Sequence, residues 1–222
     1  MIVVGNLLLI WVAKRLRRDG QVGMNEIAII PFMLFCLIAT VTPGPNNMIN
    51  LAQGMRLGFW RAMPFALGTG LGVGSLLFAV VMGLGAATAA SPTVNLIMRA
   101  ATGIYLIYLA WKIATSPPVG KEAPGAGLGF WGGIGFQWIN PKTWASSMAM
   151  TTAYLPATPS YQNGLISAGL FCTIAWLTQP IWIGFGSALR RLLSNPRTAR
   201  IVNVGFAAVL LASTLPFLLM PH

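Results

Sequence analysis

The sequence predicts an all-α membrane protein with six transmembrane helices, arranged as two inverted three-helix repeats with broken opening helices. Three observations lead to this fold class. Hydrophobic residues make up 56% of the chain and charged residues only 8%, whereas a soluble domain usually carries about a quarter charged residues. Apolar stretches of spanning length follow one another, separated by short gaps rich in proline, glycine and basic residues. A proline motif interrupts one apolar stretch in each half of the chain.

The apolar stretches set the number of expected spans. A transmembrane helix needs about 20 mostly apolar residues. Five stretches meet this length directly, and a sixth meets it with an interruption by Asn140, Pro141 and Lys142: 27–50, 62–88, 94–114, 162–188, 200–219 and the interrupted 127–156. The gaps leave no room for a soluble domain. We therefore expect one transmembrane domain over residues 24–222, with repeat halves of about 24–117 and 118–222.

The basic residues indicate how these helices are oriented. The net charge of +11 comes from 14 Lys and Arg against three acidic residues. These residues form no patch with interleaved aromatic side chains, so a nucleic-acid partner is not expected. The gaps after the first, third and fifth spans are basic, and the other two are nearly neutral. Because cytoplasmic loops collect Lys and Arg, those three gaps are predicted to be cytoplasmic and both termini to lie outside.

Residues 1–23 do not fit this pattern. Residues 2–13 are apolar but too few to span, and the basic run Lys14-Arg15-Leu16-Arg17-Arg18 follows them. A signal peptide carries its charges before the apolar run. We interpret 1–23 as an extension or a mis-assigned start, with Met24 as the ordinary beginning. The alternative is a short interfacial helix with a basic flank.

The first proline motif is the strongest candidate for a functional site. Proline removes a backbone donor and clashes with the preceding turn, so a helix must break there. In a bilayer the freed backbone groups must find partners or line a wet cavity, and neighbouring carboxamides can both donate and accept hydrogen bonds. A structural kink whose Asn side chains cap the next half-helix is the alternative. The candidate residues are Pro43, Gly44, Pro45, Asn46 and Asn47.

The second break lies at a corresponding place in the other half of the chain. Its candidate residues are Gln137, Asn140, Pro141 and Lys142. Lys142 is either an anchor that reaches the membrane surface or a partner for a substrate carboxylate. Gln179, which precedes Pro180, is a further candidate to face the same cavity. Paired proline and glycine breaks in two halves indicate a transport site, although coincidence of two ordinary kinks would give the same pattern.

Four alternating glycines in the second span predict close helix packing. Gly68, Gly70, Gly72 and Gly74 include two GxxxG spacings, and small residues allow helices to approach closely in membranes.

No metal site, cofactor or catalytic residue is expected. The single histidine is the last residue, His222, and the two cysteines lie separately in apolar stretches.

At its motifs the sequence resembles the LysE/RhtB family of bacterial amino-acid exporters, also described as LysE family translocators. The resemblance covers about Met24 to Leu219, so residues 1–23 lie outside the family pattern. It is carried by Thr42-Pro43-Gly44-Pro45-Asn46, Arg56-Leu57-Gly58-Phe59, Gly103-Ile104-Tyr105-Leu106-Ile107-Tyr108-Leu109-Ala110-Trp111 and Gln137-Trp138-Ile139-Asn140-Pro141-Lys142. It implies six helices, a bacterial inner-membrane location, and efflux of amino acids or small derivatives; with the orientation that the loop charges predict, both termini would be periplasmic.

The expected function is therefore secondary export of an amino acid by alternating access, with the substrate held between the two breaks. The partners expected are the amino-acid substrate and membrane lipids, and a homo-oligomer is left open. The alternative is a membrane-embedded enzyme or a lipid scramblase that uses the same broken helices. An enzyme would need a nucleophile, base or metal constellation, and Ser, Thr and Lys occur here without a histidine or carboxylate beside them.

Overall fold

The computed structural model describes residues 28–86, 128–190 and 196–219, together with scattered positions between 93 and 115. Residues 1–23 and most of the predicted span 94–114 lie outside this part of the chain. The described residues form helices and no strand. The elements are α2 (Ile29–Val41), α3 (Pro45–Leu57), α4 (Phe59–Ala79), η1 (Val80–Leu84), α7 (Gly129–Ile139), α8 (Pro141–Tyr154), α9 (Tyr161–Leu189) and α10 (Pro196–Leu219).

Two of the described helices are long and apolar enough to cross a membrane, namely Phe59–Leu84 and Tyr161–Leu189. The pair α2 and α3 forms a third candidate span that is bent by 52° at its break. The helices α7 and α8, of 11 and 14 residues, are each too short to span alone. An all-helical membrane protein is confirmed, and the count of six spans stays a prediction.

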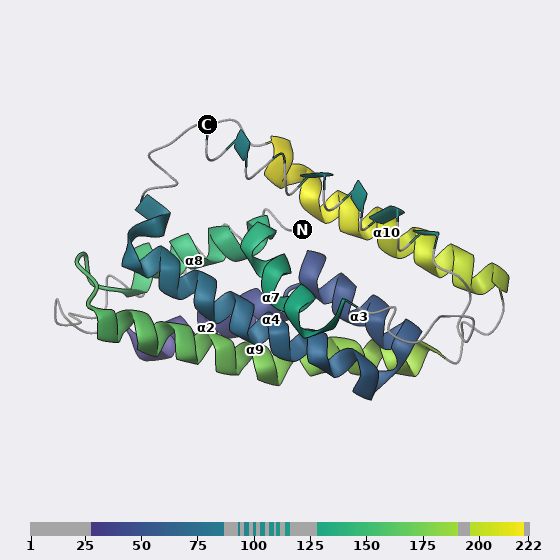
Figure 1. The fold of residues 1–222 in the computed structure, drawn as a ribbon, viewed down its shortest axis with the longest axis horizontal. Helices are drawn as coiled ribbons and strands as arrows, with labels where there is room; N and C mark the ends of the chain where they lie inside the picture. Colours follow the sequence, from purple (N-terminus) through teal and green to yellow (C-terminus); the bar gives the residue numbers. More distant parts are fainter. Residues whose placement is uncertain are drawn as a thin grey trace.

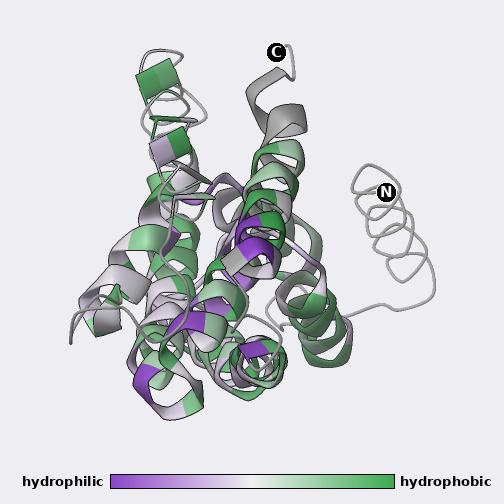
Figure 2. Ribbon diagram, turned by 90° about the vertical axis from the view of Figure 1, so that its right-hand side faces the viewer, coloured by the Kyte–Doolittle hydropathy of each residue, from purple (hydrophilic) through white to green (hydrophobic). Residues whose placement is uncertain are grey.

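The outer surfaces of the helices are apolar, as a bilayer requires. Ile30, Leu177 and Ile201 expose 73%, 70% and 72% of their side chains. In Figure 2, green hydrophobic ribbon alternates with pale ribbon of intermediate hydropathy, and only a few segments are purple and hydrophilic. Because soluble proteins rarely expose large contiguous apolar surfaces, these side chains are suited to contact lipid tails.

The two broken segments run in opposite directions. Ala28 N donates to Tyr154 O at 3.2 Å, so α2 begins where α8 ends. Gln53 Oε1 accepts a hydrogen bond from Leu128 N at 3.2 Å, so α3 ends where α7 is about to begin. The long helix α9 runs along one side of the molecule and α10 along the other (Figure 1). The helix α4 packs against both α7 and α9, and α3 packs against α9.

Three of the described arginines mark one end of this bundle. Arg56 lies at the end of α3, Arg61 at the start of α4 and Arg190 at the end of α9. The Arg190 side chain lies against Gly58, which joins α3 to α4. We call this the basic end. The opposite end, where α2 and α9 begin and α8 ends, is the neutral end.

Glycine allows α4 to touch α7 backbone to backbone. A Cβ atom added to Gly68 would lie 1.9 Å from Phe130 O, and one added to Gly133 would lie 2.3 Å from Phe65 O. No side chain fits at such distances, so both helices need glycine at the crossing. The prediction that the glycines of the second span serve packing is confirmed.

A second crossing of the same kind joins α3 to α9. A Cβ atom on Gly54 would lie 2.3 Å from Ile183 O, and one on Gly186 would lie 2.0 Å from Leu51 O. Each crossing joins a helix from the first half of the chain to one from the second. At these two crossings the two halves of the chain meet through backbone contacts.

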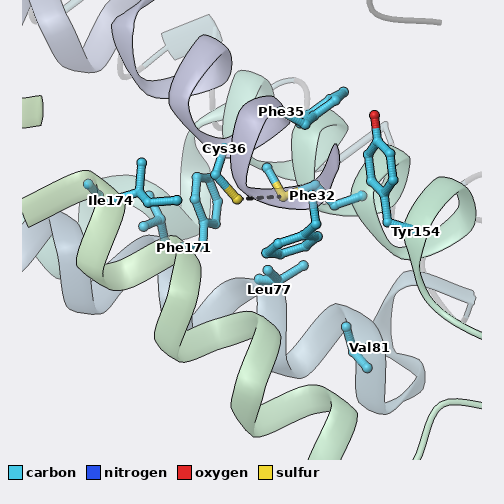
Figure 3. Packing of buried hydrophobic residues seen from close by; sticks show 11 residues of the cluster. Phe32, Phe35, Cys36, Leu77, Val81, Tyr154, Phe171 and Ile174 are labelled. Carbon is cyan, nitrogen blue, oxygen red and sulfur yellow. Dashed lines mark hydrogen bonds between the residues drawn. The ribbon is translucent and has the colours of Figure 1, made fainter. Parts of the chain in front are cut away.

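An apolar cluster fills the neutral end of the bundle (Figure 3). Phe32 and Cys36 of α2 are fully buried there. Phe35 meets Tyr154 edge to face, with ring centroids 5.6 Å apart. The Cys36 thiol donates to Met150 Sδ at 3.7 Å, and Phe171 and Ile174 close the cluster from α9. This packing holds α2, α8 and α9 together beside the breaks.

Candidate functional site

The first break is built by its two prolines. The chain leaves α2 at Thr42 and passes Gly44 in extended conformation before α3 begins at Pro45. Because Pro43 and Pro45 have no N–H, carbonyl groups at the end of α2 lack their helical partners. Asn47 Nδ2 supplies a donor to Thr40 O at 2.9 Å and to Thr42 O at 2.8 Å.

The second break has a matching construction. Asn140 is extended between α7 and α8, and its side chain accepts a hydrogen bond from Lys142 N at 3.1 Å. Pro141 occupies the first turn of α8, as Pro45 occupies that of α3. Proline is favoured at this position because its missing donor is one that the helix does not use. Each break thus ends one helix and starts another within a few residues.

Lys142 joins the two breaks. Its Nζ donates to Thr42 O at 2.5 Å, across the gap between α8 and the end of α2. A Cβ atom on Gly44 would lie 2.8 Å from Lys142 Cδ, so glycine leaves the space through which the lysine passes. An anchor at the membrane surface would direct its ammonium outward. The observed position differs, because the ammonium points to the first break.

Asn46 is the centre of a buried carboxamide network beside the breaks. Its Nδ2 donates to Gln179 Oε1 at 2.8 Å. Its Oδ1 accepts hydrogen bonds from Gln137 Nε2 at 2.9 Å and from Thr69 Oγ1 at 3.3 Å. These side chains come from α3, α9, α7 and α4, so one residue holds four helices in register.

Gln137 extends the network to the second break. Its Oε1 accepts hydrogen bonds from Thr143 Oγ1 at 2.9 Å and from Asn140 Nδ2 at 3.3 Å. The Gln137 side chain is 1% exposed, so water does not replace these bonds. In a low-dielectric interior such bonds are strong, and an unpaired member is costly.

Replacement of Gln137 by leucine is therefore expected to destabilise the protein and to disturb the site. The change keeps the volume but leaves Asn46 Oδ1, Asn140 Nδ2 and Thr143 Oγ1 with fewer partners. Buried polar groups left unpaired cost about 1–3 kcal/mol each, so we expect a loss of roughly 2–4 kcal/mol. The measurement is the thermal unfolding temperature in lipid nanodiscs, followed by a transport assay.

Thr173→Val is the matched control for this variant. The Thr173 hydroxyl is exposed and bonds only within its own helix, to Gly169 O at 2.8 Å. Exposed substitutions of this kind usually change stability by less than about 0.5 kcal/mol. Equal unfolding temperatures for Gln137→Leu and Thr173→Val would contradict a network centred on Gln137.

A small cavity lies between the two breaks. About 30 Å³ of it is open to the centres of water molecules, which is room for a few waters and not for an amino acid. The ends of four half-helices meet here, two bringing backbone donors and two bringing acceptors. The cavity is lined by Ala39, Thr40, Gly44, Asn46, Asn47, Val73, Gln137, Asn140, Lys142, Thr143, Ser146, Phe171 and Gln179.

The residues that the sequence singled out are thus brought together. Gly44, Asn46, Asn47, Gln137, Asn140 and Lys142 line the cavity, and Gln179 faces it as expected. Pro43, Pro45 and Pro141 shape the breaks. Thr40, Thr69 and Thr143 were missed, because a threonine inside an apolar helix usually bonds its own backbone. In the sequence they carry no signal that separates them from such residues.

A polar cavity between two helix breaks, within an apolar helical bundle, is the arrangement expected of a membrane transport protein. The LysE type translocator model matches residues 37–220, and the chain belongs to this family. It is an amino-acid export transporter, as the sequence motifs led us to expect.

Curated relatives carry the name cysteine/O-acetylserine efflux protein. The chain is 34% identical over 166 residues to the one from Salmonella choleraesuis (strain SC-B67), which covers 69% of this chain and 82% of the relative. It is 28% identical over 193 residues to that of Shigella flexneri serotype 5b (strain 8401), which covers 84% and 95%. No solved structure matches.

Proposed function

We propose that this exporter carries small neutral amino acids, or neutral derivatives of them, out of the bacterial cytoplasm. The observation that supports this most directly is the Lys142 ammonium, held on Thr42 O inside the cavity. The described residues include no Asp or Glu. A cationic side chain brought into this cavity would meet a positive charge and no carboxylate to balance it.

The proposed binding mode uses both charges of a zwitterion. The substrate carboxylate pairs with the Lys142 ammonium, and the substrate ammonium takes the place of that lysine at the carbonyls of Thr40 and Thr42. Carboxamides of Asn46, Asn47 and Gln137 complete the contacts, since they can donate or accept. Gly44 leaves space beside these carboxamides because it has no side chain. The backbone of the break at Asn140 offers further hydrogen-bonding groups. Charge-assisted bonds of this kind are shorter and stronger than neutral ones.

Alternating access is supported by the size of the cavity and by the course of the broken segments. Because the cavity is too small for an amino acid, the helices around it must move apart for a substrate to enter. The segments α2–α3 and α7–α8 run in opposite directions and both start their second helix with proline. This is the local arrangement expected if the chain consists of two inverted three-helix repeats that rock about the site.

The orientation follows from the charges. Arg56, Arg61 and Arg190 lie at the basic end, and cytoplasmic segments collect Lys and Arg. The basic end would therefore face the cytoplasm and the neutral end the periplasm, which also places both termini of a six-span chain on the periplasmic side of the inner membrane.

A substrate panel tests the proposal. In proteoliposomes, we expect uptake of labelled cysteine and serine to exceed that of lysine and arginine at least tenfold, because the cationic side chains lack a counter-charge. The names of the relatives, which mention cysteine and O-acetylserine, support the choice of cysteine as the first probe. Empty liposomes measure the leak.

Two outcomes would contradict the proposal. Equal uptake of lysine and cysteine would show that Lys142 does not select by charge. No uptake of any amino acid, combined with movement of fluorescent phospholipids between leaflets, would favour the lipid scramblase that the broken helices could also form.

A further inference from the structure

One face of α3 carries a line of amides that continues beyond the cavity. Asn46, Asn50 and Gln53 are spaced i, i+4 and i+7, so they lie above one another on the helix. At 1.5 Å per residue, Asn50 and Gln53 lie about 6 and 10 Å further along the axis than Asn46. This direction leads from the cavity to the basic end. Asn50 is 0% and Gln53 6% exposed.

In each of these two amides, only one of the two polar atoms forms a hydrogen bond with another described residue. Asn50 Nδ2 donates to Asn46 O at 3.2 Å and to Gln179 Oε1 at 2.8 Å. Gln53 Oε1 accepts a hydrogen bond from Leu128 N at 3.2 Å. These partners fix which amide atom is nitrogen and which is oxygen. Asn50 Oδ1 and Gln53 Nε2 are buried and have no hydrogen-bond partner among the residues that the structure describes.

The unused atoms are complementary to the head group of an amino acid. Asn50 Oδ1 is an acceptor, as an ammonium requires, and Gln53 Nε2 is a donor, as a carboxylate requires. They lie one helical turn apart, on side chains that are neighbours on the helix surface. Buried polar groups are almost always paired, so two unused atoms of opposite kind on one helix face indicate a ligand.

We propose that Asn50 and Gln53 form a second binding site for the zwitterionic head group, between the cytoplasmic basic end and the cavity. This inference rests on the proposed function. The ammonium would donate to Asn50 Oδ1 and the carboxylate would accept from Gln53 Nε2. The site opens when the start of α7 moves away from α3, since the Gln53–Leu128 hydrogen bond closes the two helices over it. Neutral amides bind weakly enough to pass a substrate on.

The test uses three ligands that differ only in their charged groups. Cysteine has both groups, cysteamine lacks the carboxylate and 3-mercaptopropionate lacks the ammonium. Binding is measured by calorimetry on the full chain in nanodiscs, in a Lys142→Met background that removes the proposed carboxylate partner in the cavity. The carbonyls of Thr40 and Thr42 can still take an ammonium in this background, so the second site is reported by the part of the remaining binding that changes of Asn50 and Gln53 alter.

The expected result is a crossed pattern. Gln53→Leu should weaken cysteine and 3-mercaptopropionate about tenfold and leave cysteamine within about twofold, as for loss of one hydrogen bond to a charged group. Asn50→Leu should weaken cysteine and cysteamine by the same factor and leave 3-mercaptopropionate unchanged. Ser167→Ala, whose buried hydroxyl bonds within its own helix to Gly164 O, is the control and should change none of the three.

A purely structural role would weaken all three ligands equally in both variants and would overturn the proposal. The absence of any binding in the Lys142→Met background would also overturn the second site. In that case the proposed function would still stand if the wild-type protein binds and transports cysteine. If the wild-type protein carries no neutral amino acid, the proposed function itself fails. Should Gln53→Leu not fold, Gln53→Glu keeps an oxygen for Leu128 N and replaces only the free N–H. It should weaken the two carboxylate ligands and not cysteamine.

Discussion

Replacement of Lys142 by methionine is expected to lower cysteine transport by about 10- to 100-fold while the protein still folds. Methionine fills the space of the aliphatic lysine chain beside Gly44 but cannot donate to Thr42 O or to a carboxylate. Hydrogen bonds to charged groups contribute about 1.5–3 kcal/mol, and each 1.4 kcal/mol is a factor of ten. The measurement is the initial rate of labelled cysteine uptake into proteoliposomes, normalised to reconstituted protein.

Arg61→Gln provides the control, because Arg61 is an exposed cation at the basic end and its loss removes the same charge without touching the cavity. We expect transport close to that of the wild type. A wild-type transport rate in the Lys142→Met variant would show that Lys142 does not bind the substrate and that its contact with Thr42 is structural.

Replacement of Gly133 by alanine is expected to have the largest effect on stability. The added Cβ would lie 2.3 Å from Phe65 O and 2.8 Å from Thr69 N, and both are backbone atoms that cannot rotate away. The helices α4 and α7 must separate, which also pulls on Thr69 and Gln137 of the amide network. Overpacking in a close-packed interior costs about 1–3 kcal/mol of stability. We expect a clash with backbone atoms to cost about 3 kcal/mol or more. The readout is the unfolding temperature in nanodiscs.

The same helix offers a matched comparison. A Cβ atom on Gly135 would meet nothing within 4 Å, so Gly135→Ala changes the same residue type in α7 without a clash. Alanine is favoured over glycine within a helix by up to about 1 kcal/mol, so this variant should unfold at the same temperature or higher. If both variants unfolded alike, the close crossing of α4 and α7 would not limit stability.

The positions of the two breaks could be predicted from the sequence because proline acts locally. Pro43, Pro45 and Pro141 each remove a backbone donor whatever surrounds them, and the helices end and begin at these residues. The contact between the breaks followed from the expected opposite course of two similar halves. The count of six spans and the orientation stay predictions, since the third span lies mostly outside the described residues.

The polar face of α3 could not be read in the same way. The sequence predicts a first apolar stretch that ends at Asn50 and a basic gap that begins at Arg56, which leaves Gln53 outside any predicted span. In the structure α3 continues to Leu57, and Asn50 and Gln53 are buried within it. Amides in a short polar stretch resemble loop residues, and only tertiary packing shows that they face the interior.

The contact of Lys142 with Thr42 has a consequence for the return half of the transport cycle. In a carrier that needs a substrate to neutralise its site, the empty form is costly to reorient, and such a carrier exchanges one substrate for another. In the proposed binding mode the chain supplies its own cation, Lys142 Nζ, to Thr42 O once the substrate has left. The empty protein can then turn back without an unpaired group in the cavity. That property suits net efflux down a gradient, in which nothing needs to be carried inward.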